Sequence, residues 1–539
     1  MNELLVRGGL IIDGSGQPAY PGHVIIKNGR CDGIITGEAP SDEGRQVIDA
    51  AGLAVAPGFI DIHSHSDLSI LANPRCESSL QQGITTEIAG NCGWSMAPVH
   101  HAAVERLAKT LVAGLAGVPR DSTDLAWTWT TMAEFLEQVE SRGCGVNFGS
   151  YVGQSMVRAY VIGGDDRAGT ADEVRKMRRL VEQALADGAF GLSTGRSYVP
   201  GKYAGTDEIV ELSRPLGPAG GLYTSHIADQ KERVVAATEE VAEIGLRARC
   251  AVQVAHQKVC TKACFGRAGD ALAVMDRARG RGVDIASDVY PWLYTQLFTL
   301  SRALPRWATD GSVDAACARL RDPDVRRRLI EGDSRSGSAS LAETAARMAR
   351  DGVIHCRLTH HYEGMELGEV AAAKGLPLVD ALCELLAENE LAVKTAGLMS
   401  EADLIAILKH PLAMVSTDAF TLDRPLPEEE SVHPRHYGTY PQVLGRYVRE
   451  LGALTLEEAV RKMTAAPAAR VGLTDRGRIR AGCAADLVIF DPATIANTST
   501  AAEPASFPVG IAWVIVNGRL AVDHGRLTET RAGHVLRRS

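Results

Sequence analysis

The chain has 539 residues, 45% of them hydrophobic and 23% charged, which is an ordinary balance for a globular protein. Its 57 basic and 66 acidic residues give a net charge of -9, which argues against nucleic acid or an anionic membrane surface as the main partner. The sequence has no run of eighteen apolar residues and no signal-peptide pattern, and its eleven cysteines lack the spacing of a disulfide framework. We therefore expect a cytoplasmic protein with one large domain and additions. Its oligomeric state stays open, a homo-oligomer included.

Both ends of the chain have the pattern of β-strands. Apolar and polar positions alternate through the first 57 residues, where Asn28-Gly29 is a hairpin signal, and the same character returns at 485–490 and 513–518. We predict that residues 1–57 and 470–539 come together as one small sheet domain. Two unrelated β-hairpin ends are the alternative.

Between the two ends, strand-like runs alternate with helical segments, one of which opens with a capping box at 170–173. The predicted strands end, in chain order, near His65, Cys92, Tyr151, Ser193, His226, His256, Asp288 and Asp418. Several successive ends lie 30 to 33 residues apart, about the length of one βα unit. This alternation predicts the α/β class and a (β/α)8 TIM-like barrel over residues 58–469.

The last two predicted strands are separated by an unusually long stretch. About 130 residues lie between Asp288 and Asp418, which is too many for one crossover connection. We therefore predict an inserted, mostly helical subdomain at about 296–355.

Polar side chains at the strand ends indicate a metal site, because the C-terminal ends of barrel strands share one face. His63 and His65 are two residues apart in a strand, so their side chains point the same way. A catalytic zinc takes about three ligands from His, Cys, Asp and Glu and leaves one position for water. The candidate ligands are His63, His65, Cys92, His226, His256 and Asp418.

Each candidate also has an ordinary structural alternative. Cys92, in the glycine-flanked segment 90–93, is either a thiolate ligand or a small buried core thiol. Asp418 is either the cap of a following helix or a general base that takes a proton from water. A lone strand-end histidine is usually structural, but a His-x-His followed by histidines at two successive strand ends favours the metal.

At these residues the chain resembles the amidohydrolase superfamily and, within it, the N-acyl-D-amino-acid deacylases (D-aminoacylases). The resemblance runs nearly the whole length. Its motifs lie at 57–67, 83–86, 90–93, 191–200, 256–258, 288–291, 433–439, 462–464 and 482–488. His-x-His alone is a weak signal, whereas this ordered set is a specific one.

The resemblance implies a (β/α)8 barrel with a small β-sandwich from both termini and an insertion after the seventh strand. It implies one tightly bound Zn2+, held by Cys92, His226 and His256. A second, weaker site would be bordered by His63, His65 and Asp418.

The resemblance also implies which residues receive the substrate. Lys258, Tyr290 and Arg435 would hold its carboxylate, for which a cation, a phenol and a forked guanidinium are suited. Ser193 and Tyr198, in a matching motif, are further substrate-binding candidates. The implied activity is zinc-dependent hydrolysis of the amide bond of N-acyl-D-amino acids, or of a related N-acyl amino compound, to a carboxylic acid and a free amino acid.

Two other functions are alternatives. The first is a cyclic amidase or dipeptidase, hydantoinase-like or isoaspartyl-dipeptidase-like. Those relatives generally bridge two metals with a carboxylated lysine at the fourth strand, whereas this chain has Ser193 there. The second is a non-catalytic barrel scaffold, whose signature would be lost ligands, yet all six candidates are present.

The chain departs from the family's pattern at several positions near the predicted site. Relatives commonly carry an arginine and a glutamate where this chain has Ala228 and Gln230, and a histidine at Gln154. Trp292 introduces a bulkier segment after Tyr290 than relatives often have. The candidate metal ligands match the family's pattern, whereas several residues around them do not. This combination predicts a deacylase that acts on an unusual substrate.

Overall fold

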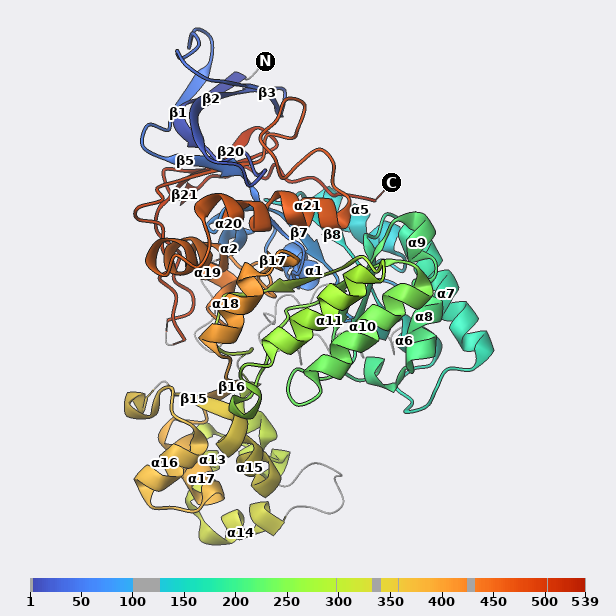
Figure 1. Ribbon diagram of the computed structural model, residues 1–539. Helices are drawn as coiled ribbons and strands as arrows, with labels where there is room; N and C mark the ends of the chain where they lie inside the picture. The colour runs from blue at the N-terminus through green and yellow to red at the C-terminus, as the bar shows by residue number, and fades with distance from the viewer. Residues whose placement is uncertain are drawn as a thin grey trace.

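The computed structural model (Figure 1) describes residues 3–99, 127–296, 298–331, 341–356, 358–423, 432–501 and 503–538. Its central element is a closed ring of parallel strands. Among these residues the ring consists of β6 (Phe59–Asp61), β7 (Ile84–Ala89), β8 (Asn147–Ser150) with β9 (Val152–Gly153), β10 (Gly191–Gly195), β11 (Leu222–His226), β12 (Ala251–Val254), β13 (Ile285–Val289) and β17 (Ala413–Val415). All neighbouring pairs are parallel.

The ring is closed between its first and last strands by a parallel bridge that joins Ser64 to Ala419. Only Tyr151 separates β8 from β9, so these two segments are one barrel position. The ring therefore has the eight positions of a (β/α)8 barrel, and the predicted fold class is confirmed.

Helices cover the outside of the ring (Figure 1). Their bounds are α1 (Ser66–Ala72), α2 (Glu77–Leu80), α5 (Met132–Arg142), α6 (Gln154–Val161), α7 (Ala171–Ala186), α8 (Thr206–Ser213), α9 (Leu216–Ala219), α10 (Val234–Ala248), α11 (Ala268–Gly280), α18 (Glu401–Lys409), α19 (Arg435–Gln442), a π-helix (Val443–Glu450), α20 (Leu456–Met463) and α21 (Ala465–Val471). The predicted capping box is present: the Thr170 side chain accepts from the Glu173 amide, and the Glu173 side chain accepts from the Thr170 amide. No helix among the described residues is long and apolar enough to cross a membrane.

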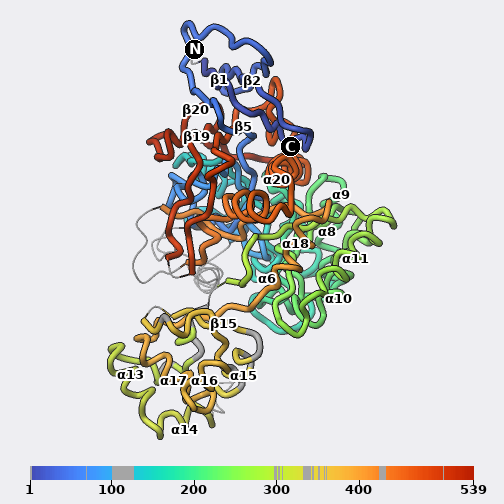
Figure 2. Tube along the Cα trace, turned by 60° about the vertical axis from the view of Figure 1, so that its left-hand side comes forward, coloured from blue at the N-terminus to red at the C-terminus, as the bar shows by residue number. Residues whose placement is uncertain are grey.

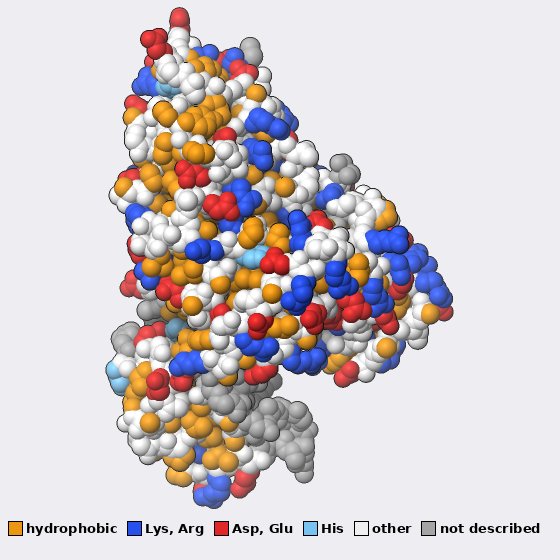
Figure 3. Space-filling model, in the orientation of Figure 1, with side chains coloured by type: hydrophobic (Ala, Val, Ile, Leu, Met, Phe, Trp, Pro, Cys, Tyr) orange, Lys and Arg blue, Asp and Glu red, His pale blue; other side chains and the backbone are white. Residues whose placement is uncertain are grey.

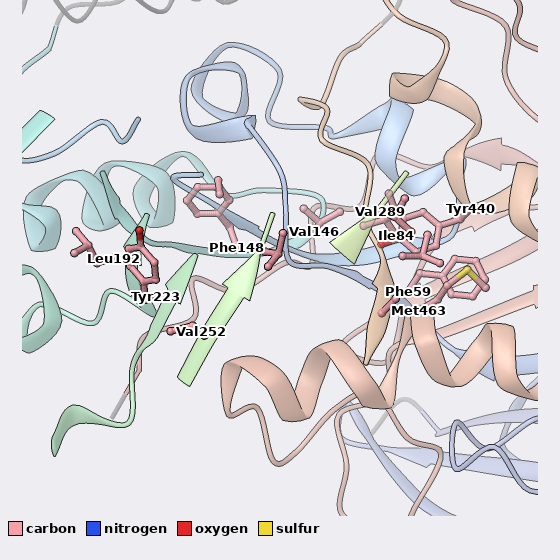
Figure 4. Close-up of a cluster of buried hydrophobic side chains, with 14 of the residues drawn as sticks. Phe59, Ile84, Val146, Phe148, Leu192, Tyr223, Val252, Val289, Tyr440 and Met463 are labelled. Carbon is pink, nitrogen blue, oxygen red and sulfur yellow. The ribbon is translucent and has the colours of Figure 1, made fainter. Parts of the chain in front are cut away.

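Alternation along the strands separates two layers of the core. Phe59 points outward and stacks on Tyr440 with ring centroids 5.1 Å apart, whereas Ile60 packs in the barrel interior with Tyr151. Figure 4 shows the outer layer, in which Phe59 and Tyr440 lie beside Met463 of α20. Successive residues of a strand point to opposite faces, so each barrel strand supplies side chains to both layers. Burial of each large side chain contributes roughly 1.5–3 kcal/mol to the stability of the fold.

The two termini build one sheet beside the barrel. In the described parts of the chain its order is β21-β20-β19-β18-β5-β1-β2-β3, with β4 also paired to β1. The bounds are β1 (Glu3–Ile11), β2 (Tyr20–Lys27), β3 (Arg30–Ile35), β4 (Gln46–Asp49), β5 (Ala54–Pro57), β18 (Leu487–Phe490), β19 (Ile511–Val516), β20 (Arg519–Asp523) and β21 (Arg526–Leu527). Strand β5 pairs with β1 on one side and β18 on the other, so the predicted joining of the termini is confirmed.

Two Asn-Gly turns shape this sheet. Asn28-Gly29 joins β2 to β3, as the sequence predicted, and Asn517-Gly518 joins β19 to β20. All four residues have positive φ, from 47° to 78°, as the tight two-residue hairpin turn requires. The turns touch each other: a Cβ on Gly518 would lie 2.6 Å from the Cα of Gly29.

Between β13 and β17 the chain leaves the barrel and forms a separate lobe (Figures 1 and 2). The lobe has a small sheet of order β14-β16-β15. Its bounds are β14 (Phe298–Thr299), α12 (Arg306–Thr309), α13 (Val313–Arg321), α14 (Pro323–Glu331), α15 (Leu341–Asp351), β15 (Gly352–Cys356), α16 (Leu367–Lys374), α17 (Leu378–Glu388) and β16 (Val393–Gly397).

This lobe has its own core, which runs from Leu300 through Leu382 to Val393. The lobe therefore extends past residue 355, where the sequence analysis placed the end of the insertion. The reason is that α17 packs back onto α13 and β16 pairs with β15, and these long-range contacts leave no mark in the local pattern.

Candidate metal centre

The candidate ligands lie just after barrel strands, except His226, which is the last residue of β11. Cys92, His256 and Asp418 have φ values of 53°, 35° and 52°, in the left-handed region that non-glycine residues rarely adopt. Such conformations cost on the order of 1–3 kcal/mol each and persist only where the surroundings enforce them. Three of them at the same end of the barrel indicate that the backbone is bent to aim these side chains inward.

The loop that carries Cys92 is held from both sides. The Ser193 hydroxyl donates to the Gly90 carbonyl at 2.5 Å and accepts from the Gly93 amide at 3.0 Å. The Asn91 side-chain amide donates to the Ile62, Ser64 and Ile88 carbonyls at 3.1 to 3.4 Å. The thiol is thereby fixed between the first, second and fourth barrel positions.

Four donor atoms converge at this point. Cys92 Sγ lies 3.4 Å from His63 Nε2 and 3.4 Å from His256 Nε2, and His63 Nε2 lies 3.4 Å from Asp418 Oδ1. The ligand atoms of these four buried residues all lie within 4.8 Å of one another. Zinc binds thiolate at about 2.3 Å and imidazole at about 2.0 Å, so donors spaced in this way fit one such ion.

The two remaining histidines lie at the edge of this group. His226 Nδ1 is 3.7 Å from Cys92 Sγ, and its ring centroid is 4.5 Å from that of His256. His65 Nε2 is 3.1 Å from Asp418 Oδ1. The structure therefore brings all six predicted ligands together, with Cys92 in contact with three of the four histidines.

The electrostatics favour metal-binding protonation states at Cys92 and His256. At the other two, burial is outweighed by acidic neighbours, which raise the pKa of His63 well above its usual value and that of His65 to about 9. Burial alone would raise the pKa of the Cys92 thiol, but His256 and His63 outweigh burial and hold that pKa well below its usual range. Burial, with the charge of Lys258 beside it, lowers the pKa of His256 to about 4. A thiolate and a neutral imidazole are the forms that bind zinc.

Asp418 is kept ionised in the same environment. Burial opposes its charge, but Arg435 and His256, together with contacts to the first-strand histidines, hold the pKa of Asp418 well below its usual range. Arg435 donates from Nη1 to Asp418 Oδ2 at 2.6 Å. The carboxylate is thus available as a proton acceptor beside the metal-ligand group.

Asp288 organises the histidines from behind. Its Oδ1 lies 3.0 Å from His63 Nδ1 and accepts from the His256 amide at 2.8 Å and from the Ser416 hydroxyl at 2.8 Å. Gln253 Nε2 donates to its other oxygen at 3.0 Å. Sequence reasoning marked Asp288 as a strand end but gave it no role. The available signal was its position two residues before Tyr290, on the strand that faces His63.

The predicted carboxylate receptors form one cluster beside Asp418. Lys258 Nζ lies 4.9 Å and Arg435 Cζ lies 5.1 Å from the centroid of the Tyr290 ring. Tyr290 is 1% exposed, and its hydroxyl has no hydrogen-bond partner among the described residues. Buried polar atoms are nearly always paired, so an unpaired hydroxyl on a ring with two cations nearby marks a place for an acceptor group.

The two further substrate candidates differ in placement. Tyr198 faces the group, since its hydroxyl lies 3.2 Å from His226 Nδ1. Ser193 is fully buried, and its hydroxyl is engaged by the loop that carries Cys92, so the structure places it behind a candidate metal ligand. Ser193 was predicted to bind substrate because it lies in a matching motif, and a motif does not show the direction in which a side chain points.

The four departures have distinct placements. Gln230 Nε2 lies 3.1 Å from His256 Nδ1, and Trp292 Nε1 donates to Thr439 Oγ1 at 3.2 Å. Gln154 is fully buried with no partner for its amide in the described parts of the chain, whereas Ala228 is exposed. Gln230 is therefore a neutral group directly behind a metal-ligand candidate.

Comparison with known proteins agrees with this geometry. A model of the amidohydrolase family matches residues 46–522. The chain is 34% identical to a D-aminoacylase from Alcaligenes xylosoxydans xylosoxydans, over all of this chain and 98% of the relative. It is also 34% identical to an N-acyl-D-aspartate deacylase of the same organism, over 99% of this chain and 95% of the relative.

Solved structures give the same picture. A D-aminoacylase crystal structure superposes with a TM-score of 0.76 and 33% identity over 99% of both chains. An N-acyl-D-glutamate deacylase from Bordetella bronchiseptica, complexed with zinc and a phosphonate inhibitor, superposes equally well at 33% identity over 99% of both chains. A D-hydantoinase from Thermus sp., at 18% identity and a TM-score of 0.54 over 99% of both chains, shares the fold alone.

Proposed function

The chain belongs to the amidohydrolase family, and from that premise we propose that it hydrolyses the amide bond of N-acyl-D-amino acids to a carboxylic acid and a free D-amino acid. The observation that carries this proposal is the contact between the two halves of the site. Arg435, one of the predicted carboxylate receptors, donates directly to Asp418, which lies within the metal-ligand group. A substrate carboxylate bound there would place its neighbouring amide next to the metal.

The proposed metal is zinc, held tightly by Cys92, His226 and His256, with a weaker second position bordered by His63, His65 and Asp418. Cys92 Sγ lies 3.4 Å from His256 Nε2 and 3.7 Å from His226 Nδ1, which supports the tight set. His65 Nε2 lies 3.1 Å from Asp418 Oδ1, which supports the second position. When bound, zinc polarises the amide carbonyl and lowers the pKa of water toward neutrality. Relatives of this chain have been crystallised with zinc and with copper.

Asp418 is the proposed proton carrier. Its Oδ1 lies 3.1 Å from His65 and 3.4 Å from His63, while its Oδ2 is held by Arg435. The carboxylate would take the proton from the attacking water and return it to the departing amine nitrogen. Holding one oxygen with Arg435 fixes the other toward the metal-ligand group, so the proton moves over a short, defined path.

Lys258, Tyr290 and Arg435 are the proposed receptors of the substrate carboxylate. Arg435 uses Nη1 on Asp418, and its Nε has no partner among the described residues, so one guanidinium could bind substrate and base together. The unpaired Tyr290 hydroxyl would donate a further hydrogen bond. A charge-assisted pair of this kind contributes more than a neutral hydrogen bond and fixes the orientation of the substrate.

Two finer assignments accompany the activity. A cytoplasmic location is supported by eleven cysteines that are all buried and unpaired in the described parts of the chain. A homo-oligomer stays a prediction, and light scattering on the purified zinc-loaded protein would test it.

The alternatives are less well supported. β10 ends at Ser193-Thr194-Gly195, without the lysine that a carboxylated bridge requires, and the likeness to hydantoinases is one of fold. A non-catalytic scaffold would not be expected to retain six converging donors and an unpaired Tyr290.

The proposed activity is tested with a panel of N-acyl-D- and N-acyl-L-amino acids, with hydantoin and isoaspartyl dipeptides as comparison substrates and zinc supplied. We expect turnover of D-substrates, loss of turnover with a chelator and recovery with zinc. Turnover confined to L-substrates or to the cyclic and isoaspartyl compounds would overturn the proposal.

A further inference from the structure

A cavity of about 730 Å³ lies where the two termini of the chain meet. Its walls are the start of β1, the Asn28-Gly29 and Asn517-Gly518 turns, and the tail segment 528–534. Its size lies in the range of pockets that hold small organic ligands. The proposed hydrolysis makes no use of this cavity.

The cavity is at the opposite end of the barrel from the metal centre. Gly533 of its lining pairs with Cys144, just before β8 begins, and His534 accepts from the amide of Phe148. Metal-ligand candidates follow the C-terminal ends of strands, whereas this tail lies beside the N-terminal end of one. A ligand here would therefore be separate from the substrate.

The lining is strongly basic. Its charged or titratable residues in the described chain are Arg30, Arg476, Arg519, Arg531, His534 and Glu3. The remaining polar side chains are amides and hydroxyls. The chain as a whole has more acidic than basic residues, 66 against 57, so a lining with four arginines and one acid departs from the overall composition. Over the face shown in Figure 3, acidic and basic side chains are interspersed.

The single acid does not neutralise the cavity, because Glu3 is already paired with two basic residues outside the lining. Arg45 Nε donates to Glu3 at 2.9 Å, and Lys27 Nζ lies 3.6 Å from its other oxygen. The lining carboxylate is thus compensated without drawing on any of the four arginines.

Two of the arginines have acidic partners and two do not. Arg476 pairs with Asp486, and Arg30 lies 3.6 Å from Asp475. Within the described residues the Arg519 side chain has no hydrogen bond or ion pair. Arg531 donates only to a backbone carbonyl, that of Arg142, at 3.1 Å. The cavity therefore carries two guanidinium groups, on the exposed residues Arg519 and Arg531, that have no acidic ion-pair partner among the described residues.

The walls between these arginines are rigid. Asn517 is fixed through its amide, which donates to Asn147 Oδ1 at 2.8 Å and to the Ala532 carbonyl at 2.7 Å, and through its backbone N–H, which donates to Asp486 Oδ1 at 2.7 Å. The two Asn-Gly turns support each other, since a Cβ on Gly29 would lie 2.9 Å from the Asn517 carbonyl oxygen. A fixed frame lowers the entropy that a ligand loses on binding.

We propose that this cavity is a binding site for a phosphate group, free or carried by a small molecule, held by Arg519 and Arg531 with Arg30 and His534 at its margin. Guanidinium forks bind phosphate through paired, charge-assisted hydrogen bonds. The site ties the N-terminal strands to the C-terminal tail. Occupation therefore stabilises the folded chain, because a ligand that binds only the native state raises its unfolding midpoint.

The experiment uses the full-length zinc-loaded protein and two probes, inorganic phosphate and ribose 5-phosphate, against sodium chloride at matched ionic strength. Calorimetry gives the affinity and thermal unfolding gives the shift in Tm. We expect saturable binding with a rise in Tm that chloride does not produce. Tighter binding of ribose 5-phosphate would identify an organic phosphate as the ligand, and equal binding would identify free phosphate.

Arg519→Gln and Arg531→Gln are each expected to weaken phosphate binding about tenfold or more, a loss of one charge-assisted contact, and the double variant to abolish it. Arg175→Gln, on the exposed face of α7, removes the same charge away from the cavity and should bind phosphate as the unaltered protein does. Unchanged Tm and hydrolysis without phosphate would show that each variant is folded. Absence of saturable binding, or equal binding by the double variant, would overturn the proposal without touching the proposed hydrolysis.

Discussion

At the scale of single residues, the site depends on side chains that hold others in place as much as on the ligands themselves. The sulfur of Cys92 lies at the centre of the site, yet Ser193 and Asn91 hold the loop that positions it. His63 and His256 are both oriented by one carboxylate, Asp288. Function at this scale should therefore respond to residues that contact no substrate.

Asp418→Asn separates proton transfer from metal binding. The amide keeps the size of the side chain and its contact with Arg435 but cannot accept the proton, so we expect turnover to fall by roughly 10²- to 10⁴-fold. Zinc content, measured by elemental analysis, should stay near that of the unaltered protein. Near-normal turnover would show that another group is the base.

Asp288→Asn tests the support behind the histidines. Its oxygen accepts from the His256 amide and the Ser416 hydroxyl and faces His63, and replacing such a partner typically costs 10- to 100-fold in metal affinity. Competition with a chromophoric chelator measures this loss. Asp270→Asn, at an exposed site on α11, is the matched control and should leave zinc affinity unchanged. Equal zinc affinity in both variants would show that Asp288 does not support the metal site.

At the scale of elements, the loop after β7 connects the fold to the chemistry. Ser193, on β10, holds both ends of this loop, and deleting its hydroxyl would leave the buried amide of Gly93 unpaired. An unmade hydrogen bond of this kind costs about 1–3 kcal/mol.

Ser193→Ala should therefore lower the free energy of unfolding of the zinc-free protein by about 1–3 kcal/mol and weaken zinc binding. Denaturant titration and chelator competition measure the two effects. Ser213→Ala is the control, since Ser213 is equally buried and its hydroxyl has no partner among the described residues. If Ser193 instead contacted the substrate, Ser193→Ala would raise KM and leave the free energy of unfolding and the zinc affinity unchanged.

Elements also show where sequence reasoning succeeded and where it stopped. His63 and His65 lie close together, with ring centroids 5.6 Å apart, but not in a strand as predicted, because β6 ends at Asp61 and both histidines follow it. The regular spacing of strand ends gave the barrel order, because it is a local property of the chain. The end of the lobe and the direction of the Ser193 side chain depend on long-range packing. Asp288 was visible as a strand end, but its partner His63 lies more than two hundred residues away.

At the scale of the whole molecule, the lobe is a second folding unit attached to the barrel through two chain crossings. Its core shares no residue with the barrel core. A substitution that destabilises one core should therefore increase local unfolding of that unit before it affects the other unit.

Leu382→Ala, in the middle of the lobe core, should destabilise the lobe by about 2–5 kcal/mol. Hydrogen exchange should quicken across 341–356 and 378–397, while β11 and β12 keep their protection and zinc stays bound. Leu216→Ala, buried in the barrel core, is the matched change and should have the opposite distribution. Uniform loss of protection in both variants would mean that the two cores unfold as one.

Strand β5 leads directly into β6, the strand that precedes the first histidine pair, and β5 is paired with β1 on one side and β18 on the other. During synthesis, every residue of the barrel leaves the ribosome before 487–490 does. The nascent chain therefore carries β5 with one edge unpaired, a template for pairing with a neighbouring chain, until residues 487–490 have been made. A product that stops before these residues would keep that edge exposed.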